Sequence, residues 1–94
     1  MDIDVADAPD QHRFEARTDD GSVAGFAAYR IDGGQLVFTH TKVDDAYEGE
    51  GVGSQLVRDV LDQLRDRETP VRSECSFINS WVEKHPEYQT VVTS

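Results

Sequence analysis

Three glycines alternate with other residues in the segment 48–54, and this segment leads directly into the one long amphipathic pattern of the chain. The preceding residues are typical of a strand, and residues 51–67 are typical of a helix. A glycine-rich turn from a strand into a helix leaves several backbone N–H groups without partners inside the helix. The turn directs these groups, with the positive end of the helix dipole, at one point. Such a point suits a phosphate group.

The same glycines have a simpler interpretation as a tight turn, because glycine adopts a positive φ angle without steric cost. The positions of Gly51 and Gly53 favour the phosphate-binding interpretation. Both lie where the helix begins, and glycine in a helix costs roughly 0.5–1 kcal/mol relative to alanine. A turn alone would not need glycine so far into the helix.

The length and charge of the chain limit the classes of protein that it can represent. Its 94 residues predict one domain, spanning 1–94. Nineteen acidic residues against nine basic residues give a formal net charge of −10, so we expect no nucleic-acid partner, because the phosphates would be repelled. The acidic residues are spread along the chain, and only two residues are lysines. This pattern predicts the surface of a protein from a salt-loving organism, in which high salt screens the repulsion between the acidic side chains. An ordinary acidic surface is the alternative.

No segment of the sequence has the features of a targeting signal, a membrane span or a metal site. The first residues lack the basic and apolar regions of a signal peptide, and no apolar run approaches the roughly 20 residues of a membrane span. We therefore expect a cytoplasmic protein without a membrane partner. The only cysteine, Cys75, cannot form an internal disulfide, and the three histidines show no metal-ligand spacing, so we predict no metal.

The residues before the glycine loop predict an antiparallel meander. Residues 1–11 are interpreted as a frayed arm or a short edge segment. Three strands follow at 12–17, 23–31 and 35–43, joined by hairpin turns at the two aspartate-glycine clusters. In the third strand, strict alternation places Leu36, Phe38, His40 and Lys42 on one face and the residues between them on the other.

The residues after the loop predict a helix, a strand and a second helix. The apolar positions of the first helix recur at the spacing of one buried face: Val52, Leu56, Val57, Val60, Leu61 and Leu64. Pro70 favours an end to this helix. Residues 71–76 are expected to pair in parallel with the third strand, since a helix connects them. A short helix over 77–85 follows, and residues 88–92 form a closing segment. Phe77 and Trp81 are expected in the core, with stacking on a substrate as the alternative.

This order of elements, read with four sets of residues, resembles a small single-domain branch of the GNAT superfamily of acetyl-coenzyme A-dependent N-acetyltransferases. The residues are His40-Thr41-Lys42-Val43, the glycine loop with Leu56-Val57, Cys75-Ser76-Phe77, and His85-Pro86-Glu87-Tyr88. The pyrophosphate loop of the superfamily usually begins with arginine or glutamine, where this chain has Glu48. The resemblance implies an α/β (α+β) fold that is reduced relative to full-sized members.

The resemblance also implies where acetyl-coenzyme A would bind. The parallel strands on either side of the glycine-loop helix separate, and the pantetheine arm lies in the gap. Expected cofactor-binding residues are Thr41, Lys42 and Val43 for the pantetheine amides, and Gly49, Glu50, Gly51, Val52, Gly53 and Ser54 for the pyrophosphate. Backbone dipoles would allow an acidic protein to bind this anion. The short length implies a shallow acceptor cleft, which suits a polypeptide or polyamine-like amine.

His40 and Cys75 are the candidate catalytic residues. His40 lies near the end of its strand and is the first candidate for the base that accepts the amine proton, or else a half-buried strand histidine. Cys75, on the neighbouring strand, could instead be a nucleophile that forms an acetyl-enzyme, or a buried pocket wall. Glu74 should face the opposite side, and Tyr88 is a further candidate proton donor. We favour direct attack by the amine, because no lysine or arginine flanks Cys75.

Three functions are consistent with the sequence. The first is an N-acetyltransferase that acts on an unidentified amine. The second is a module that binds or senses coenzyme A without turnover, since a fold does not fix an activity. The third is a small interaction domain in which the glycines only form a turn. The sequence does not predict the oligomeric state.

Overall fold

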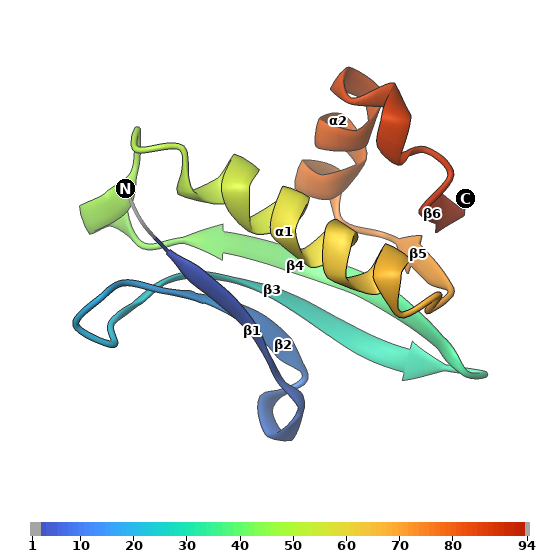
Figure 1. Cartoon of the computed structure of the whole chain (residues 1–94), viewed down its shortest axis with the longest axis horizontal. Coiled ribbons are helices and arrows are strands. Elements are labelled where there is room, and N and C mark those ends of the chain that lie inside the picture. The colour runs from blue at the N-terminus through green and yellow to red at the C-terminus, as the bar shows by residue number, and fades with distance from the viewer. Residues whose placement is uncertain (1–2, 94) are drawn as a thin grey trace.

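The computed structural model describes residues 3–93 and is built on one six-stranded sheet, in the order β1-β2-β3-β4-β5-β6. The strands are β1 (Asp4–Ala8), β2 (Arg13–Arg17), β3 (Val23–Asp32), β4 (Gln35–Val43), β5 (Val71–Ser73) and β6 (Val92–Thr93). The first four pair antiparallel, and β5 and β6 join in parallel. The helices α1 (Val52–Asp66) and α2 (Ser76–Lys84) lie on the same side of the sheet (Figure 1). This arrangement confirms the predicted mixed α/β fold.

Of the two alternatives predicted for the N-terminal segment, the short edge segment is confirmed and the frayed arm is wrong. Residues 4–8 form the edge strand β1, so four antiparallel strands precede the loop and not three. Its short, acidic sequence gives a weak strand signal, and bonds to distant residues hold it. Gln63 Nε2 donates to the Val5 carbonyl oxygen at 2.9 Å, and the Tyr29 hydroxyl donates to Asp7 at 2.6 Å. Residues 1 and 2 lie outside the described part of the chain.

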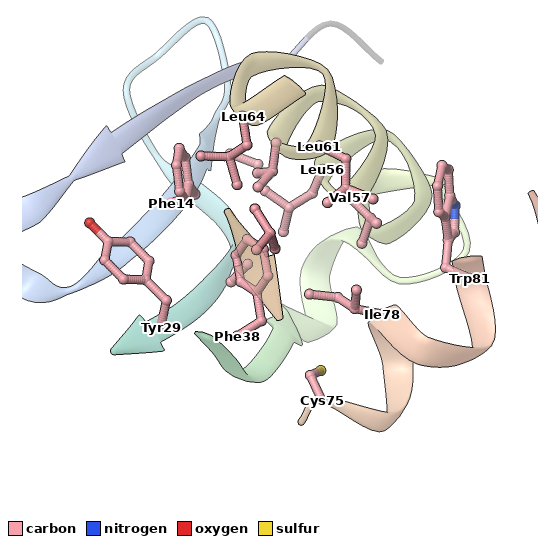
Figure 2. Close-up of a cluster of buried hydrophobic side chains, with 14 of the residues drawn as sticks. Phe14, Tyr29, Phe38, Leu56, Val57, Leu61, Leu64, Cys75, Ile78 and Trp81 are labelled. Carbon is pink, nitrogen blue, oxygen red and sulfur yellow. The ribbon is translucent and has the colours of Figure 1, made fainter. Parts of the chain in front are cut away.

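The amphipathic stripe of α1 forms the centre of the core, as predicted. All six of its apolar residues are at most 2 % exposed. Figure 2 shows the side chains of Leu56, Leu61 and Leu64 directed toward Phe14 and Phe38, which come from the sheet. Burial of each such side chain stabilises the fold by about 1.5–3 kcal/mol, so this contact fixes α1 across the strands. None of the helices within residues 3–93 combines the length and hydrophobicity needed to cross a membrane.

A β-bulge at Thr39 changes which side chains of β4 face the helices. Phe38 pairs with Tyr29 and His40 pairs with Ala28, so Thr39 has no partner across the ladder. An extra residue in one strand reverses the alternation beyond it. The strict alternation predicted for 35–43 is therefore wrong. Thr41, and not His40, continues the helix-facing side that begins with Leu36 and Phe38.

The strands β4 and β5 pair over only three residues and then separate. β5 pairs with Leu36–Phe38, and the last contact is the Glu74 N–H donating to the Phe38 carbonyl oxygen at 2.8 Å. Beyond it the chain turns into α2, so the predicted strand over 71–76 ends early, at Ser73. Within residues 3–93, no strand pairs with this edge of β4 after Phe38. The sheet is therefore open between β4 and β5 beyond Phe38.

Candidate functional site

A pocket of about 470 Å³ lies where β4, the glycine loop and the starts of both helices meet. Seven of the nine residues expected to bind the cofactor line this pocket, all except Lys42 and Glu50. Tyr47, Glu48 and Phe77 complete its wall. The fold therefore brings the glycine loop and the end of β4 to one concave site.

The glycines at 49 and 51 are required by the backbone conformation of the loop. Their φ angles are +83° and +78°, in the left-handed region, and no heavy atom lies within 4 Å of an added Cβ at either position. Side chains other than glycine rarely adopt this conformation. The loop can thus turn sharply from β4 into α1 while its backbone stays open to the pocket.

Backbone donors at the start of α1 lie at the pocket without a side-chain cap. The first intrahelical bond of α1 runs from the Gln55 N–H to the Gly51 carbonyl oxygen at 3.1 Å. The N–H groups of Val52, Gly53 and Ser54 precede it and have no intrahelical acceptor. Gly51 has no side chain to cap them, and the first turn holds no acidic residue. Three such donors and the positive end of a helix dipole favour an anion in this position.

Gly53 has a different role from the other two glycines, because it allows close packing. A Cβ at this position would lie 2.7 Å from Cζ of Phe77 and 3.3 Å from Cγ2 of Val43. Its absence lets α1 approach both α2 and β4. Phe77 itself is 43 % exposed, so its predicted place in the core is wrong: its ring forms the wall of the pocket.

Trp81 connects the two helices beside the pocket. Its indole N–H donates to Ser54 Oγ at 2.8 Å, and its ring stacks on His85 with centroids 3.8 Å apart. Trp81 is 7 % exposed, as predicted for a core residue. His85 follows α2 as its C-cap, in agreement with the predicted helix end. The first turn of α1 is thus fixed by a side-chain bond from α2.

Cys75 lies at the point where β4 and β5 separate. It is the N-cap residue of α2, it is 5 % exposed, and its Sγ lies 3.3 Å from Thr41 Oγ1. Ser73 Oγ accepts a hydrogen bond from the Cys75 N–H at 3.2 Å and so fixes the turn that follows β5. Figure 2 shows Cys75 beside Ile78, at the margin of the hydrophobic cluster. The thiol therefore borders the gap next to β4.

His40 lies on the other face of the sheet. It pairs with Ala28, its ring centroid is 6.1 Å from that of Phe26, and it is exposed. The predicted convergence of His40 with Cys75 is wrong, because the bulge at Thr39 turns His40 away from the helices. The side chain brought to Cys75 is that of Thr41.

The two weaker candidates for acid or base chemistry also lie away from the pocket. Glu74 faces the helix-free side, as predicted, and hydrogen bonds from Arg30, at 2.8 Å and 2.9 Å, lower the pKa of its carboxyl. The Tyr88 hydroxyl donates to Asp62 at 2.8 Å on the far part of α1. Burial and this hydrogen bond raise the pKa of Tyr88. The described residues contain no cluster of His, Cys, Asp and Glu side chains placed for a metal ion.

Sequence reasoning missed three features of the pocket: Tyr47, Phe77 and the side chain of Thr41. A local signal for Tyr47 exists, since the Asp44 side chain accepts a hydrogen bond from the Ala46 N–H at 2.9 Å and starts a short 3₁₀ turn that ends at Tyr47. Aspartate in such a turn is recognisable from sequence. The position of the Thr41 side chain depends on the bulge at Thr39, and that of Phe77 depends on how α1 and α2 pack at Gly53.

Comparisons with known proteins agree with one another. A family model described as GCN5-related N-acetyl-transferase matches residues 13–91, a span that contains the whole pocket and Cys75. Among solved structures, the solution NMR structure of a proposed GCN5-like N-acetyltransferase from Staphylococcus aureus superposes with a TM-score of 0.70. Its sequence is 26 % identical, over 97 % of this chain and 88 % of that chain. The comparison with curated proteins returned no match.

Proposed function

Because the chain belongs to the GCN5-related N-acetyltransferases, which take acetyl-coenzyme A as acyl donor, we propose that it binds acetyl-coenzyme A in the pocket between β4, the glycine loop and α2. The single observation that carries this proposal is the start of α1, with three N–H donors and no side-chain cap at the pocket wall. An exposed phosphate group satisfies such donors well.

In this proposal the pyrophosphate is bound by the backbone of the loop and not by basic side chains. The pocket wall contains no lysine or arginine, and it contains one carboxylate, that of Glu48. Backbone N–H groups and the dipole of α1 supply fixed positive potential without a charged side chain. This explains how a chain of net charge −10 can bind a polyanion.

The pantetheine arm would follow the open edge of β4. The Asp44 N–H donates to the Ala24 carbonyl oxygen, on the β3 side, at 2.8 Å. Backbone groups alternate sides along a strand, so those of Thr41 and Val43 point to the opposite edge, which no strand pairs with after Phe38. Amide groups of an extended ligand can bind there as an added strand would. The reactive end then lies near Cys75.

Acetyl transfer in this arrangement takes place by direct attack. The amine nitrogen forms a bond to the thioester carbonyl carbon, the carbon–sulfur bond breaks, and the sulfur leaves as a thiolate while a base accepts the amine proton. The Thr41 hydroxyl and the Cys75 thiol, which lie 3.3 Å apart where β4 and β5 separate, would be the donors that stabilise the departing thiolate. His40 would accept the proton, through water, from an amine that approaches from the helix-free side. The acceptor is a polypeptide or polyamine-like amine, because both helices lie on the cofactor side of the sheet and leave the opposite face uncovered (Figure 1).

A thermal melt with coenzyme A and acetyl-coenzyme A tests the binding step. A ligand that binds only the folded state stabilises it by about 2.7 kcal/mol at a concentration of 100 times Kd, so the midpoint should rise with ligand concentration. Consumption of acetyl-coenzyme A with candidate amines then tests transfer. A midpoint that stays constant up to millimolar coenzyme A would contradict the proposal.

A further inference from the structure

The helix-free face of the sheet has a different charge balance from the chain as a whole. Strand pairing places five of the nine basic side chains on this face: Arg13, Arg17, Arg30, Lys42 and Arg72. The carboxylates that share the face are those of Asp4, Glu15, Asp32, Asp44 and Glu74. These ten charges cancel, whereas the whole chain has a net charge of −10. The face is therefore the part of the sheet that an anionic partner can approach.

Lys42 is the basic side chain on this face that remains available to such a partner. Each of the four arginines contacts the carboxylate of Glu15 or Glu74. The exposed ammonium group of Lys42 has no ion pair among residues 3–93. Asp44 lines the same hollow, but its carboxylate accepts a hydrogen bond from the Ala46 N–H at 2.9 Å. A free ammonium group of this kind can bind an external carboxylate.

The hollow beside Lys42 has a volume of about 240 Å³ and an aromatic floor. Phe26 forms this floor and is the direct partner of Lys42 across β3 and β4. The guanidinium carbon of Arg13 lies 4.6 Å from the centroid of the Phe26 ring, and the His40 ring centroid lies 6.1 Å from it. The half-buried phenyl ring is thus surrounded by two cations and by the imidazole that the proposed function makes the proton acceptor.

The spacing of His40 and Lys42 relates the acceptor amine to a second group on the acceptor. The two residues are two positions apart on one face of β4, so about 6.6–6.8 Å separates them along the strand. An extended acceptor chain advances about 3.3–3.6 Å per residue. With its amine at His40, its second and third residues therefore reach Lys42. A carboxylate there gains a charge-assisted bond, whereas the second cation of a polyamine is repelled.

We infer that the hollow beside Lys42 selects acidic polypeptides as acceptors, by binding a carboxylate that lies one or two residues from the acceptor amine. The inference rests on the proposed function and narrows its acceptor to one class. Arg13 adds positive potential at a fixed place, because Glu15 and the Phe26 ring hold its guanidinium. The phenyl ring also excludes water from one side of the hollow, so the attraction is screened less than in bulk water.

Peptide titrations of the protein saturated with coenzyme A test the inference, followed by the backbone amide resonances of β3 and β4. The probes are Ala-Glu-Glu-Ala, Ala-Gln-Gln-Ala and Ala-Lys-Lys-Ala, each with a free N-terminus and an amidated C-terminus. Wild-type protein should bind the glutamate peptide roughly threefold to tenfold more tightly than the glutamine peptide, and the lysine peptide most weakly. Lys42→Gln should bring the first two within about twofold of each other, and Lys42→Glu should invert the order.

Two controls separate this inference from its premise. Lys84→Glu makes the same change of net charge on α2, on the other side of the sheet, and should keep the wild-type order. Because both lysines are exposed, all variants should keep the wild-type circular dichroism spectrum.

Four results would overturn the inference and leave the proposed function standing. These are no peptide binding, equal wild-type affinities for the three peptides, the wild-type order in Lys42→Glu, and tighter binding of the lysine peptide or of spermidine than of the glutamate peptide. A wild-type protein that does not bind coenzyme A would overturn the proposed function and the inference with it.

Discussion

The hydroxyl oxygen of Thr41 lies 3.3 Å from the sulfur of Cys75, at the point where β4 and β5 separate. This contact depends on the bulge at Thr39, since without it the side chain of Thr41 would face away from the helices. The same bulge places His40 on the opposite side of the sheet. One extra residue in β4 therefore decides which polar groups adjoin the proposed thioester position.

Cys75→Ala should keep much of the acetyl-transfer activity, because direct attack needs no enzyme nucleophile. Intact-mass measurement of wild type and variant, each mixed with acetyl-coenzyme A alone, should show no acetylated protein. A stoichiometric acetyl adduct that forms at a competent rate and is lost in Cys75→Ala would instead establish an acetyl-cysteine route.

Gly51→Val should lower the affinity for coenzyme A by at least about tenfold, because a side chain in the left-handed region distorts the backbone that holds the donors. Gly34→Val is the matched control. The φ angle of Gly34 is +82°, close to the +78° of Gly51, and an added Cβ also meets nothing within 4 Å. Both variants should lose about 1–2 kcal/mol of stability, and only the first should lose affinity. Equal affinities in the two variants would argue against the loop as the binding site.

Most of the order of elements could be predicted from sequence because these elements have local signals, whereas the short acidic strand β1 and the early end of β5 do not. The stripe of α1, the glycine-rich turns and Pro70 mark their own positions, and the structure places them within one or two residues of the predicted bounds. The bulge at Thr39 has no such signal, since threonine fits an ordinary strand as well. The exposure of Phe77 could not be predicted either, because it results from the close packing of α1 against α2 at Gly53.

Stability should fall as the pH rises from about 10 to 12. Burial and the hydrogen bond to the Asp7 carboxylate raise the pKa of Tyr29 from 10.0 to about 12. In this window the unfolded chain has lost the tyrosine proton and the folded chain has kept it. The contribution of Tyr29 to the free energy of unfolding is therefore complete below about pH 10 and is lost as the pH rises through about 12. Tyr29→Phe should show a shallower decline by chemical denaturation. Because the variant lacks the hydrogen bond to Asp7, its free energy of unfolding at neutral pH should also be lower by about 1 kcal/mol. An identical slope in the variant would refute this assignment.

The predicted adaptation to salt has its own test. With a net charge of −10, self-repulsion should destabilise the folded chain at low ionic strength, and potassium chloride should raise the denaturation midpoint beyond the physiological range. Urea is the suitable denaturant because it is uncharged. A midpoint that stays level or falls between about 0.15 and 2 M salt would indicate an ordinary acidic surface.

Coenzyme A binding at the start of α1 can be observed directly by titrating the isotopically labelled protein with coenzyme A and following the backbone amide resonances. The largest shifts are expected at the N–H groups of Val52, Gly53 and Ser54, with further shifts at Thr41 and Val43 along the open edge of β4. Saturable shifts that leave those five amides unmoved and appear on the helix-free face of the sheet would contradict this binding site.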